Sequence, residues 1–431
     1  MRMKKDLMRR TYLLRAAGLV GVTALAAAGC GSPAPPSPPA PVIAHGVALR
    51  EPLVDPQPFG AADTAFGLDM LGAWCQADPR SNLVLSPSSL ASGLGMAYLG
   101  ARGGTAAAMA AVLHLPATSG QALEAGLQAR STALRGLDSP GVTVNASDQV
   151  WADPTLTTLP SYLNAVATAY DAGVAKAPLL SNPNRAVSEI DQAIAAATQG
   201  QIPQLLTPGS LNDIGWVLTD ALYLHAAWAT PFPASQTSPG SFTIAAGQQA
   251  TAQFMDGGPY QTISEGGWTA VWLPYRGGKL AMIALLPPAG AAACAVPSAK
   301  ALGTVTADLA AGSARDVARE VYLPRVDLSS DVSMKSLLTG LGMGVAFTSS
   351  ADFTGLSRQA CCIGLVQQAD TLRVGEQGTT ASAATAVGVM PGAAMVGPPP
   401  VNFDRPYLML VTDAATGEPL FLARVADPAA R

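Results

Sequence analysis

Apolar residues recur along this chain with two periods, one typical of helices and one typical of strands. Helical spacing, with an apolar residue every three or four positions, occurs in four segments. These are residues 63–74, 88–98, 105–113 and 187–206. Ser86 and Pro87 suit the cap and first turn of the second helix. Apolar runs typical of buried strands span residues 216–228, 269–274, 280–286 and 407–411. The interleaved helices and strands predict a mixed α/β (α+β) domain.

The segment from Thr379 to Asn402 has an unusual pattern because it carries no charged side chain. In its first half, every second residue from Thr379 to Val389 is small or β-branched, so these side chains would share one face of a strand. The second half, from Gly388 through Pro400, cannot stay in a sheet because proline lacks the ladder donor. The pattern predicts an element that can be either a loop or an inserted strand. The alternative is an ordinary alanine-rich loop in an alanine-rich protein.

The residues around this segment resemble a known family. Glu376–Val387 (EQGTTASAATAV) is similar to the reactive-loop hinge of serpins, and residues 403–408 and 416–425 resemble the C-terminal strands of that family. Further stretches in family order are residues 82–89, 100–105, 219–228, 231–232, 273–275, 323–325 and 351–357. The resemblance covers roughly residues 62–428. It implies a serpin-like fold with a large central, mainly antiparallel sheet, additional sheets, several helices and an exposed reactive loop.

The resemblance also implies a function, that of a suicide-type inhibitor. A target protease cleaves the loop, and the freed loop inserts into the central sheet while the protease is trapped as a covalent acyl-enzyme. Loop insertion that releases stored strain is a recognised switching device. The hinge residues expected to start the insertion are small, apart from the leading Glu376; they are Glu376, Gly378, Thr379, Ala381, Ser382, Ala383 and Ala384.

The scissile bond is left open by the spacing. Counting from the hinge places the cut after Gly392, whereas counting back from Phe403 places it after Met395, which we favour; Ala394 and Met390 are further candidates. No Arg or Lys lies between Thr379 and Asn402, so a trypsin-like pocket has nothing to bind. We therefore expect elastase-like or subtilisin-like serine proteases, or a papain-like cysteine protease, as targets.

Three positions lie in the region where, in the family, the central sheet opens to admit the loop. Two of them depart from the family pattern and one matches it. Gln368, in the pair Gln367-Gln368, stands where many serpins have a His, and Asp220 replaces the Asn that often partners this His. A Gln–Asp pair can still hydrogen-bond. Trp228 matches a family Trp beneath the loop entry, where core packing is its expected role.

The N-terminus is a targeting segment. Residues 1–29 combine a positive start with an apolar stretch that is too short to span a membrane, as in a signal peptide. Ala27-Ala28-Gly29-Cys30 resembles a bacterial lipobox with Cys30 as the lipidated residue, although the family pattern prefers Leu where Ala27 stands. Arg9-Arg10 also fits a twin-arginine signal, so the export route stays open. Residues 30–57 are expected to form a Pro-rich tether, followed by a single domain over 58–431 that contains the reactive loop 376–402. We expect an exported cell-envelope lipoprotein facing outside the cytoplasm, or a secreted protein if Cys30 carries no lipid.

Composition and charge limit the classes of partner and cofactor that we expect. The chain has 431 residues, a formal net charge of −4 and 13% charged residues. This charge predicts no nucleic-acid partner, and the absence of a basic cluster predicts no heparin-type cofactor. We expect a monomer without cofactor or metal. Cys75 and Cys294 lie in apolar contexts and are expected to be buried free thiols, and the adjacent Cys361 and Cys362 rarely suit a relaxed disulfide.

Active-site motifs are missing from the sequence. Only three His residues occur, and no Gly-x-Ser-x-Gly, Ser-x-x-Lys, Cys-x-x-Cys or His-Glu-x-x-His motif is present. We therefore expect no enzyme. The alternative to a protease inhibitor is a non-inhibitory, surface-binding lipoprotein of the same fold.

Overall fold

The computed structural model describes residues 42–50, 52, 54–314, 316–379 and 398–430. All of them belong to one compact unit that spans Ala40–Arg431. The predicted signal peptide, Cys30 and residues 380–397 lie outside the described residues, as do the side chains of residues 146–148 and 220. None of the helices described in the chain combines the length and apolar character required to cross a membrane.

The described residues form the four helices that the apolar spacing predicts, one of them shorter than predicted, and four helices that it does not predict. They are α1 (Gln57–Ala77), α2 (Pro87–Gly100), α3 (Gly103–Val112), α4 (Gln121–Arg135), α5 (Pro160–Tyr170), α6 (Pro183–Ala197), α7 (Ala299–Ala310) and α8 (Lys335–Leu338). Ser86 caps α2 as predicted, because its hydroxyl accepts the Ser89 N–H at 3.3 Å and Pro87 occupies the first turn.

The predicted helix over residues 187–206 is wrong beyond Ala197. The Thr198 hydroxyl donates to the Ile194 carbonyl at 2.8 Å, and Gln199 and Gly200 have positive φ angles of 51° and 77°. The chain then folds back on α6, where the Asp191 carboxylate accepts the N–H groups of residues 205 and 206, both at 2.9 Å. The apolar residues after 197 therefore pack as a loop against the helix.

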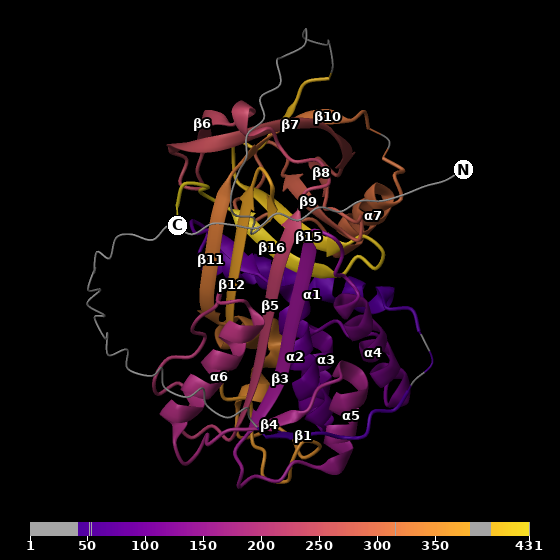
Figure 1. The fold of residues 1–431 in the computed structure, drawn as a ribbon, viewed down its shortest axis with the longest axis vertical. Coiled ribbons are helices and arrows are strands. Elements are labelled where there is room, and N and C mark those ends of the chain that lie inside the picture. The colour runs from indigo at the N-terminus through magenta and orange to yellow at the C-terminus, as the bar shows by residue number, and fades with distance from the viewer. Residues whose placement is uncertain (1–41, 51, 53, 315, 380–397, 431) are drawn as a thin grey trace, which may run out of the picture. The chain divides into compact units, whose positions relative to one another are not determined.

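The first sheet has seven strands in the order β1-β4-β3-β5-β13-β12-β11 (Figure 1). The strands are β1 (Ile43–Ala44), β3 (Val142–Ala152), β4 (Val174–Lys176), β5 (Trp216–Ala227), β11 (Val326–Ser333), β12 (Gln367–Gly375) and β13 (Gly378–Thr379). All neighbours are antiparallel except β3 and β4. This is the large, mainly antiparallel sheet that the sequence predicts.

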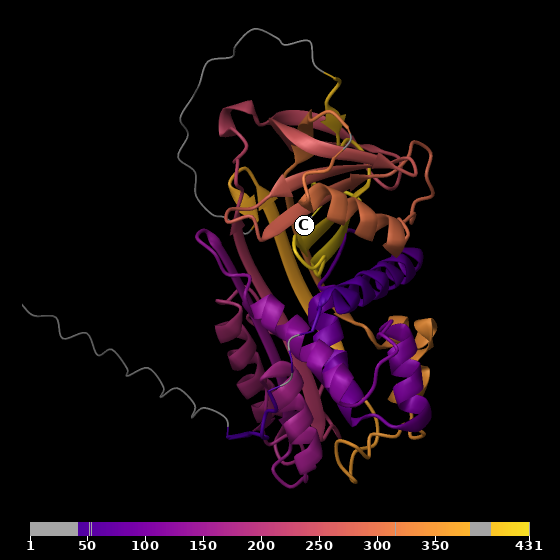
Figure 2. The ribbon, with the colours of Figure 1, turned by 90° about the vertical axis from the view of Figure 1, so that its right-hand side faces the viewer.

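The second sheet has nine strands and lies in the upper part of the molecule in Figures 1 and 2. Its order is β14-β10-β7-β8-β9-β15-β16-β2, with β6 paired to β7. The strands are β2 (Leu83–Leu85), β6 (Ser238–Thr243), β7 (Gln249–Glu265), β8 (Trp268–Pro274), β9 (Leu280–Leu286), β10 (Arg319–Pro324), β14 (Val401–Asn402), β15 (Tyr407–Asp413) and β16 (Pro419–Val425). The residues of β9, β15 and β16 are all buried, which explains why these strands are mainly apolar.

Helices cover both faces of the first sheet. On β5, Val217 and Ala221 pack into an apolar cluster with Ile190 and Ile194 of α6. The intervening Leu218 packs into a different cluster with residues of α2 and α5. Because successive strand side chains face opposite ways, α6 lies on one face and α2 and α5 lie on the other.

A disulfide and a short strand near the N-terminus are not predicted by the sequence pattern. Cys75 of α1 and Cys294 form a disulfide, so the prediction of buried free thiols is wrong. The two cysteines are 219 residues apart in the sequence, so the sequence pattern does not predict their pairing. Only the fold brings α1 beside the chain that precedes α7. Residues 43–44, within the predicted tether, pair with β4, and Asn164 of α5 accepts the Val47 N–H at 2.8 Å.

Candidate functional site

The candidate site is the short strand β13, where the loop hinge enters the first sheet. Gly378 and Thr379 lie between β5 and β12 and pair antiparallel with both. Gly378 stands opposite Ala227, and Thr379 stands opposite Ala226. In the described chain, β13 is the strand that joins β5 to β12 in the sheet order. The first residues of the hinge thus already have the position that an inserted strand would extend.

Gly378 is the residue that allows this entry. Its φ angle is 147°, in the region that L side chains rarely adopt. A Cβ atom added at this position would lie 2.0 Å from the Ala226 carbonyl oxygen. Backbone cannot yield to such a contact, so only glycine fits between the two strands.

Thr379 is fully buried above an aromatic pair. Its hydroxyl forms a hydrogen bond of 2.5 Å with the Tyr275 hydroxyl. Tyr275 stacks on Trp228 with ring centroids 4.5 Å apart and an interplanar angle of 7°. Burial raises the pKa of Tyr275 well above its ordinary value, so this hydroxyl stays protonated and available to Thr379.

Trp228 and its neighbours hold the main chain of the hinge. The indole N–H of Trp228 donates to the Gly375 carbonyl at 2.8 Å, and the backbone N–H of Trp228 donates to the Gln377 carbonyl at 2.9 Å. The Phe232 N–H donates to the Glu376 carbonyl at 2.9 Å. The turn from β12 to β13 is therefore fastened by three donors from residues 228–232.

The side chain of Glu376 forms what we call the hinge clamp, with Arg325 and Thr237. Its Oε1 accepts from Arg325 Nε at 2.7 Å, from a second guanidinium nitrogen, and from the Thr237 hydroxyl at 2.6 Å. Burial would raise the pKa of Glu376, but the hydrogen bonds from Arg325 and Thr237 outweigh it and leave this pKa lowered. The clamp connects the hinge to the end of β10 and to residue 237 ahead of β6.

The opposite end of β12 rests on the start of α2. Gln368 Nε2 donates to the Ser86 carbonyl at 3.0 Å, and the Ser86 N–H donates to the Asp370 carboxylate at 3.2 Å. Asp370 is buried, and burial raises its pKa to about 7 against the Ser86 hydrogen bond. Among the described atoms, Gln368 Oε1 has no hydrogen-bond partner. Asp220 lies opposite Asp148 in the ladder between β5 and β3, and its side chain lies outside the described residues.

The far end of the loop segment is fixed on the second sheet. Val401 and Asn402 form β14, which pairs parallel with β10. Arg319 of β10 donates to the carbonyls of Pro399 and Pro400 at 2.7 and 3.2 Å. Eight predicted site residues lie outside the described residues, seven of them between these two anchors and the predicted lipid site before the domain. They are Cys30, Ala381, Ser382, Ala383, Ala384, Gly392, Ala394 and Met395.

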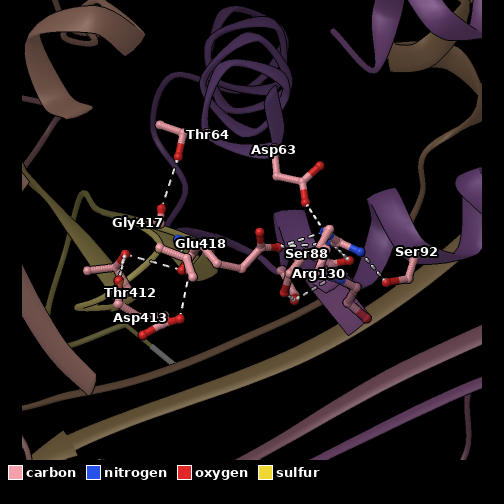
Figure 3. Close-up of polar contacts among 12 residues, drawn as sticks. Asp63, Thr64, Ser88, Ser92, Arg130, Thr412, Asp413, Gly417 and Glu418 are labelled. Carbon is pink, nitrogen blue, oxygen red and sulfur yellow. Dashed lines mark hydrogen bonds and ion pairs between the residues drawn. The ribbon is translucent and has the colours of Figure 1, made fainter. Parts of the chain in front are cut away.

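A second polar cluster, distant in sequence from the hinge, joins the first helices to the C-terminal hairpin (Figure 3). Arg130 of α4 contacts the Asp63 carboxylate at 2.5 Å and the Glu418 carboxylate at 2.9 Å. It also donates to the Ser92 hydroxyl at 2.9 Å and to the Ser88 carbonyl at 2.6 Å. Burial raises the pKa of Asp63 well above its ordinary value, Arg130 opposes this and Glu418 adds to it. We call these five residues the Arg130 cluster.

The Arg130 cluster has the chemistry of a structural fastener. All three charged side chains are 3–5% exposed, which leaves no access for a substrate. In the part of the chain that the structure describes, no group of three or more His, Cys, Asp or Glu residues could hold a metal ion. The hinge is therefore the stronger candidate for function.

Sequence reasoning missed Arg325, Thr237, Tyr275 and Asp370 as members of the site. Arg325 and Tyr275 lie in stretches that resemble the family, at residues 323–325 and 273–275, but nothing in those stretches shows that they meet the hinge. For Asp370, the sequence shows only a carboxylate within a strand, and nothing in it predicts the contact with Ser86. Contacts over 51 and 104 residues bring the first two to the hinge, and only the fold supplies them.

Comparisons with known proteins agree with the geometry. A family model described as "Serpin (serine protease inhibitor)" matches residues 61–428. The chain is 27% identical over 386 residues to the leukocyte elastase inhibitor of Bos taurus, covering 86% of this chain and 100% of that protein.

Solved structures show the same fold. The thermophilic serpin tengpin in its native state superposes with a TM-score of 0.77 at 22% identity, covering 89% of this chain and 97% of that one. Thyroxine-binding globulin in complex with thyroxine superposes with a TM-score of 0.72 at 21% identity, covering 86% and 99%.

Proposed function

The chain belongs to the serpin family, and on that premise we propose that it is a suicide-type inhibitor of proteases. The observation that carries the proposal is the position of Gly378 and Thr379, which are paired with both β5 and β12. An incoming strand would continue from Thr379 along the same two neighbours. Each residue that enters gains backbone hydrogen bonds on both sides, which drives strand addition.

The proposed mechanism uses the protease's own chemistry. The target's nucleophile attacks a carbonyl of the loop and forms an acyl-enzyme with the new C-terminal end of the hinge segment. Release of the remaining chain frees the hinge, and Ala381 to Ala384 follow Thr379 between β5 and β12. Small side chains pass without clash, whereas an unpaired charge would be costly to bury. The inserted strand carries the attached protease away from its original position before water can deacylate it.

The residues of the loop support apolar-specific targets. Met395, Gly392 and Ala394 are the candidate scissile residues, and all are small or unbranched. Elastase-like and subtilisin-like serine proteases accept such residues, and a papain-like cysteine protease is a further candidate. The bovine relative is named an inhibitor of leukocyte elastase, in line with this choice.

A second candidate function is binding without inhibition. A cavity of about 250 Å³ is lined by Trp268, Arg405, Arg424 and the apolar loop 287–295. Its mainly apolar walls suit a small apolar ligand. In that case the loop would be cut as an ordinary substrate, and the chain would gain little stability on cleavage.

The cellular setting is also part of the proposal. The positive, then apolar N-terminus followed by Cys30 supports export and lipid attachment as a bacterial, lipoprotein-type member of the family. The Pro-rich residues that follow would hold the inhibitor away from the membrane, facing outside the cytoplasm. If Cys30 carries no lipid, the protein would be secreted. We expect a monomer that engages its protease without a polyanion cofactor.

The test is a denaturing gel of the full-length chain after incubation with elastase, subtilisin or trypsin. We expect a covalent high-mass band with elastase or subtilisin, and mass spectrometry of the released C-terminal peptide then identifies the scissile bond. Cleavage of the loop by elastase or subtilisin without such a band would support the binding-protein alternative, which the thermal unfolding of cleaved and intact protein would confirm.

A pair of variants tests the mechanism at one position. Thr379→Arg puts a charge at a site with no exposure, so insertion should stall and the covalent band should disappear while the loop is still cleaved. Thr379→Ser keeps the hydroxyl and the small volume and should retain trapping. Covalent trapping by Thr379→Arg would show that the register or the mechanism is wrong.

A further inference from the structure

Cys361 and Cys362 are adjacent residues whose thiols meet outside the site described above. Their Sγ atoms are 2.7 Å apart, with Cys361 as the donor, and both residues are exposed. They are free thiols, in contrast to the bonded pair Cys75–Cys294. The two sulfurs are thus already in contact, on a surface that an external reagent can reach.

The pair lies on a segment that is held at its ends. The Ala360 N–H donates to the Ser357 carbonyl at 3.2 Å, and the Ile363 N–H donates to the Ala346 carbonyl at 2.9 Å. Ile363 is buried, 7% exposed, and β12 begins four residues later at Gln367. A change in the backbone between residues 360 and 363 should therefore also shift the start of β12, because only a few residues separate the two.

The same segment forms one wall of a cavity of about 280 Å³. Both cysteines line it, together with Trp216 and Leu218 at the start of β5 and Leu365 ahead of β12. The cavity thus lies between the start of β5 and the segment that leads into β12, and these two strands border β13. Movement of its wall would change how these strands approach each other at the end of the sheet opposite the hinge.

We propose that Cys361 and Cys362 are a reversible thiol–disulfide pair, a modification site whose closure reshapes this cavity and the start of β12. The oxidant is an external disulfide of the glutathione type. Cys361 loses its proton, attacks one sulfur of that disulfide and expels a thiolate, which leaves a mixed disulfide on Cys361. Cys362 then loses its proton and attacks the Cys361 sulfur, which closes the ring and expels the second thiolate. The protein loses two electrons and two protons, and the external disulfide becomes two thiols.

Geometry makes the closed form labile. Consecutive Cα atoms are ~3.8 Å apart across a trans peptide, shorter than the ~4.4 Å at the lower end of ordinary disulfides. Ring closure must therefore distort the peptide between the two cysteines, and strained disulfides are easily reduced. Burial and the neighbouring Cys361 thiol raise the pKa of Cys362 to about 11. Closure by Cys362 should accordingly speed up as the pH rises.

The first experiment measures the redox state directly. The full-length chain is equilibrated in buffers of varied reduced to oxidised glutathione ratio, blocked with N-ethylmaleimide, and digested with trypsin. Cleavage after Arg358 and Arg373 yields a peptide of residues 359–373 that contains both cysteines and no other. We expect this peptide to change from doubly alkylated to a form that is unalkylated and lighter by two hydrogen atoms, in a single two-electron transition.

Three results would overturn the proposal. Double alkylation at every ratio would show that the ring does not close. A stable glutathione adduct on the peptide, or a disulfide to a second chain, would show that the thiols react singly. Cys75 and Cys294 are followed on their own peptides, so that opening of the buried bond is recognised separately.

The second experiment tests the effect on the cavity, and this part rests on the proposed function. Closure should change the rate of covalent protease trapping at least twofold in the parent, and the Cys361→Ser/Cys362→Ser double variant should lose that redox dependence while still trapping protease. If the disulfide forms but the oxidised and reduced proteins trap protease at the same rate, the proposed effect on the cavity and β12 is wrong. The thiol–disulfide site itself would still be supported. If neither state traps protease, the proposed function fails independently of the redox result.

Discussion

The hinge clamp and the Arg130 cluster are two carboxylate–arginine sites in one molecule, and they differ in exposure. In the clamp, Glu376 is 11% exposed and Arg325 is 48% exposed. In the cluster, Arg130 is 3% exposed, Asp63 5% and Glu418 3%. The clamp joins a turn to the end of a strand, whereas the cluster joins three helices to a hairpin. In the clamp Arg325 can turn to water when the ion pair opens, whereas in the cluster every charged partner is buried.

This difference matches what the proposed mechanism requires of each region. A hinge that is to extend into the sheet must be held by contacts that water can replace at modest cost, because surface ion pairs contribute about 0–1 kcal/mol. The interior below it must keep its shape while a strand is added. A buried pair is strongly destabilising to break, since the remaining charge has no solvent. The variants below test the contrast from the largest effect to the smallest.

Arg130→Leu should produce the largest loss of stability. It leaves Asp63 and Glu418 buried beside each other without their cation, which we expect to lower the free energy of unfolding by about 3–5 kcal/mol. Denaturant unfolding measures the effect. Arg185→Ala is the matched control, because Arg185 pairs with Glu189 on an exposed helix face and should cost no more than about 0.5 kcal/mol. Equal losses in the two variants would remove the contrast between buried and exposed pairs.

Gly378→Ala should disrupt the hinge strand itself. The added Cβ would meet the Ala226 carbonyl oxygen at 2.0 Å, so we expect a loss of about 2 kcal/mol and a weaker covalent band with protease. Gly375→Ala is the control three residues earlier, where nothing lies within 4 Å of an added Cβ. It should change stability by less than about 0.5 kcal/mol. If both variants behave alike, the seating of β13 between β5 and β12 does not matter for the native protein.

Asp370→Asn should stabilise the protein at alkaline pH. The pKa of Asp370 is raised by burial to about 7 from an ordinary 3.8, so the folded chain holds this proton where the unfolded chain has lost it. Stability from this group is full below pH 3.8 and is lost as the pH rises through 7. The amide should therefore gain about 1–3 kcal/mol at pH 8 and little at pH 4. Unfolding curves at the two pH values check this, and a gain of the same size at both would contradict it.

Glu376→Gln should have the smallest effect on stability. Its effect on the opening of the hinge strand β13 should be easier to detect. We expect a loss of about 1 kcal/mol at neutral pH, because the half-exposed Arg325 can turn to water. The pKa of Glu376 is lowered below its ordinary 4.5, so the clamp contributes above that pH and is lost as the pH falls through the lowered value. Hydrogen exchange of the β13 amides should show faster opening in the variant at pH 7.

The control for the clamp is Asp327→Asn, which removes an ion pair with Arg373 in which both side chains are 54% exposed. Exchange at β13 should stay as in the parent. Slower exchange in Glu376→Gln, or an equal increase in both variants, would show that the clamp does not hold the hinge.

Much of the fold follows from local pattern. The apolar spacing predicts α1 to α3, and the mainly apolar runs predict β5, β8, β9 and β15, because burial on both faces of a strand favours them. The helix over residues 187–206 fails at Ala197, since Thr198 and Asp191 offer the backbone other hydrogen bonds that the apolar spacing does not reveal.

The sequence by itself determined the family resemblance, the alternation of small side chains after Thr379 and the absence of a charge in the loop. These are local properties, fixed by which residues follow one another. Only the tertiary structure decided that Arg325, Thr237 and Tyr275 meet the hinge, that Cys75 bonds to Cys294, and that Asp370 lies in a dry interior. Hydrogen bonds, disulfides and pKa values depend on distance and burial, and both are set by packing between segments that lie far apart along the chain.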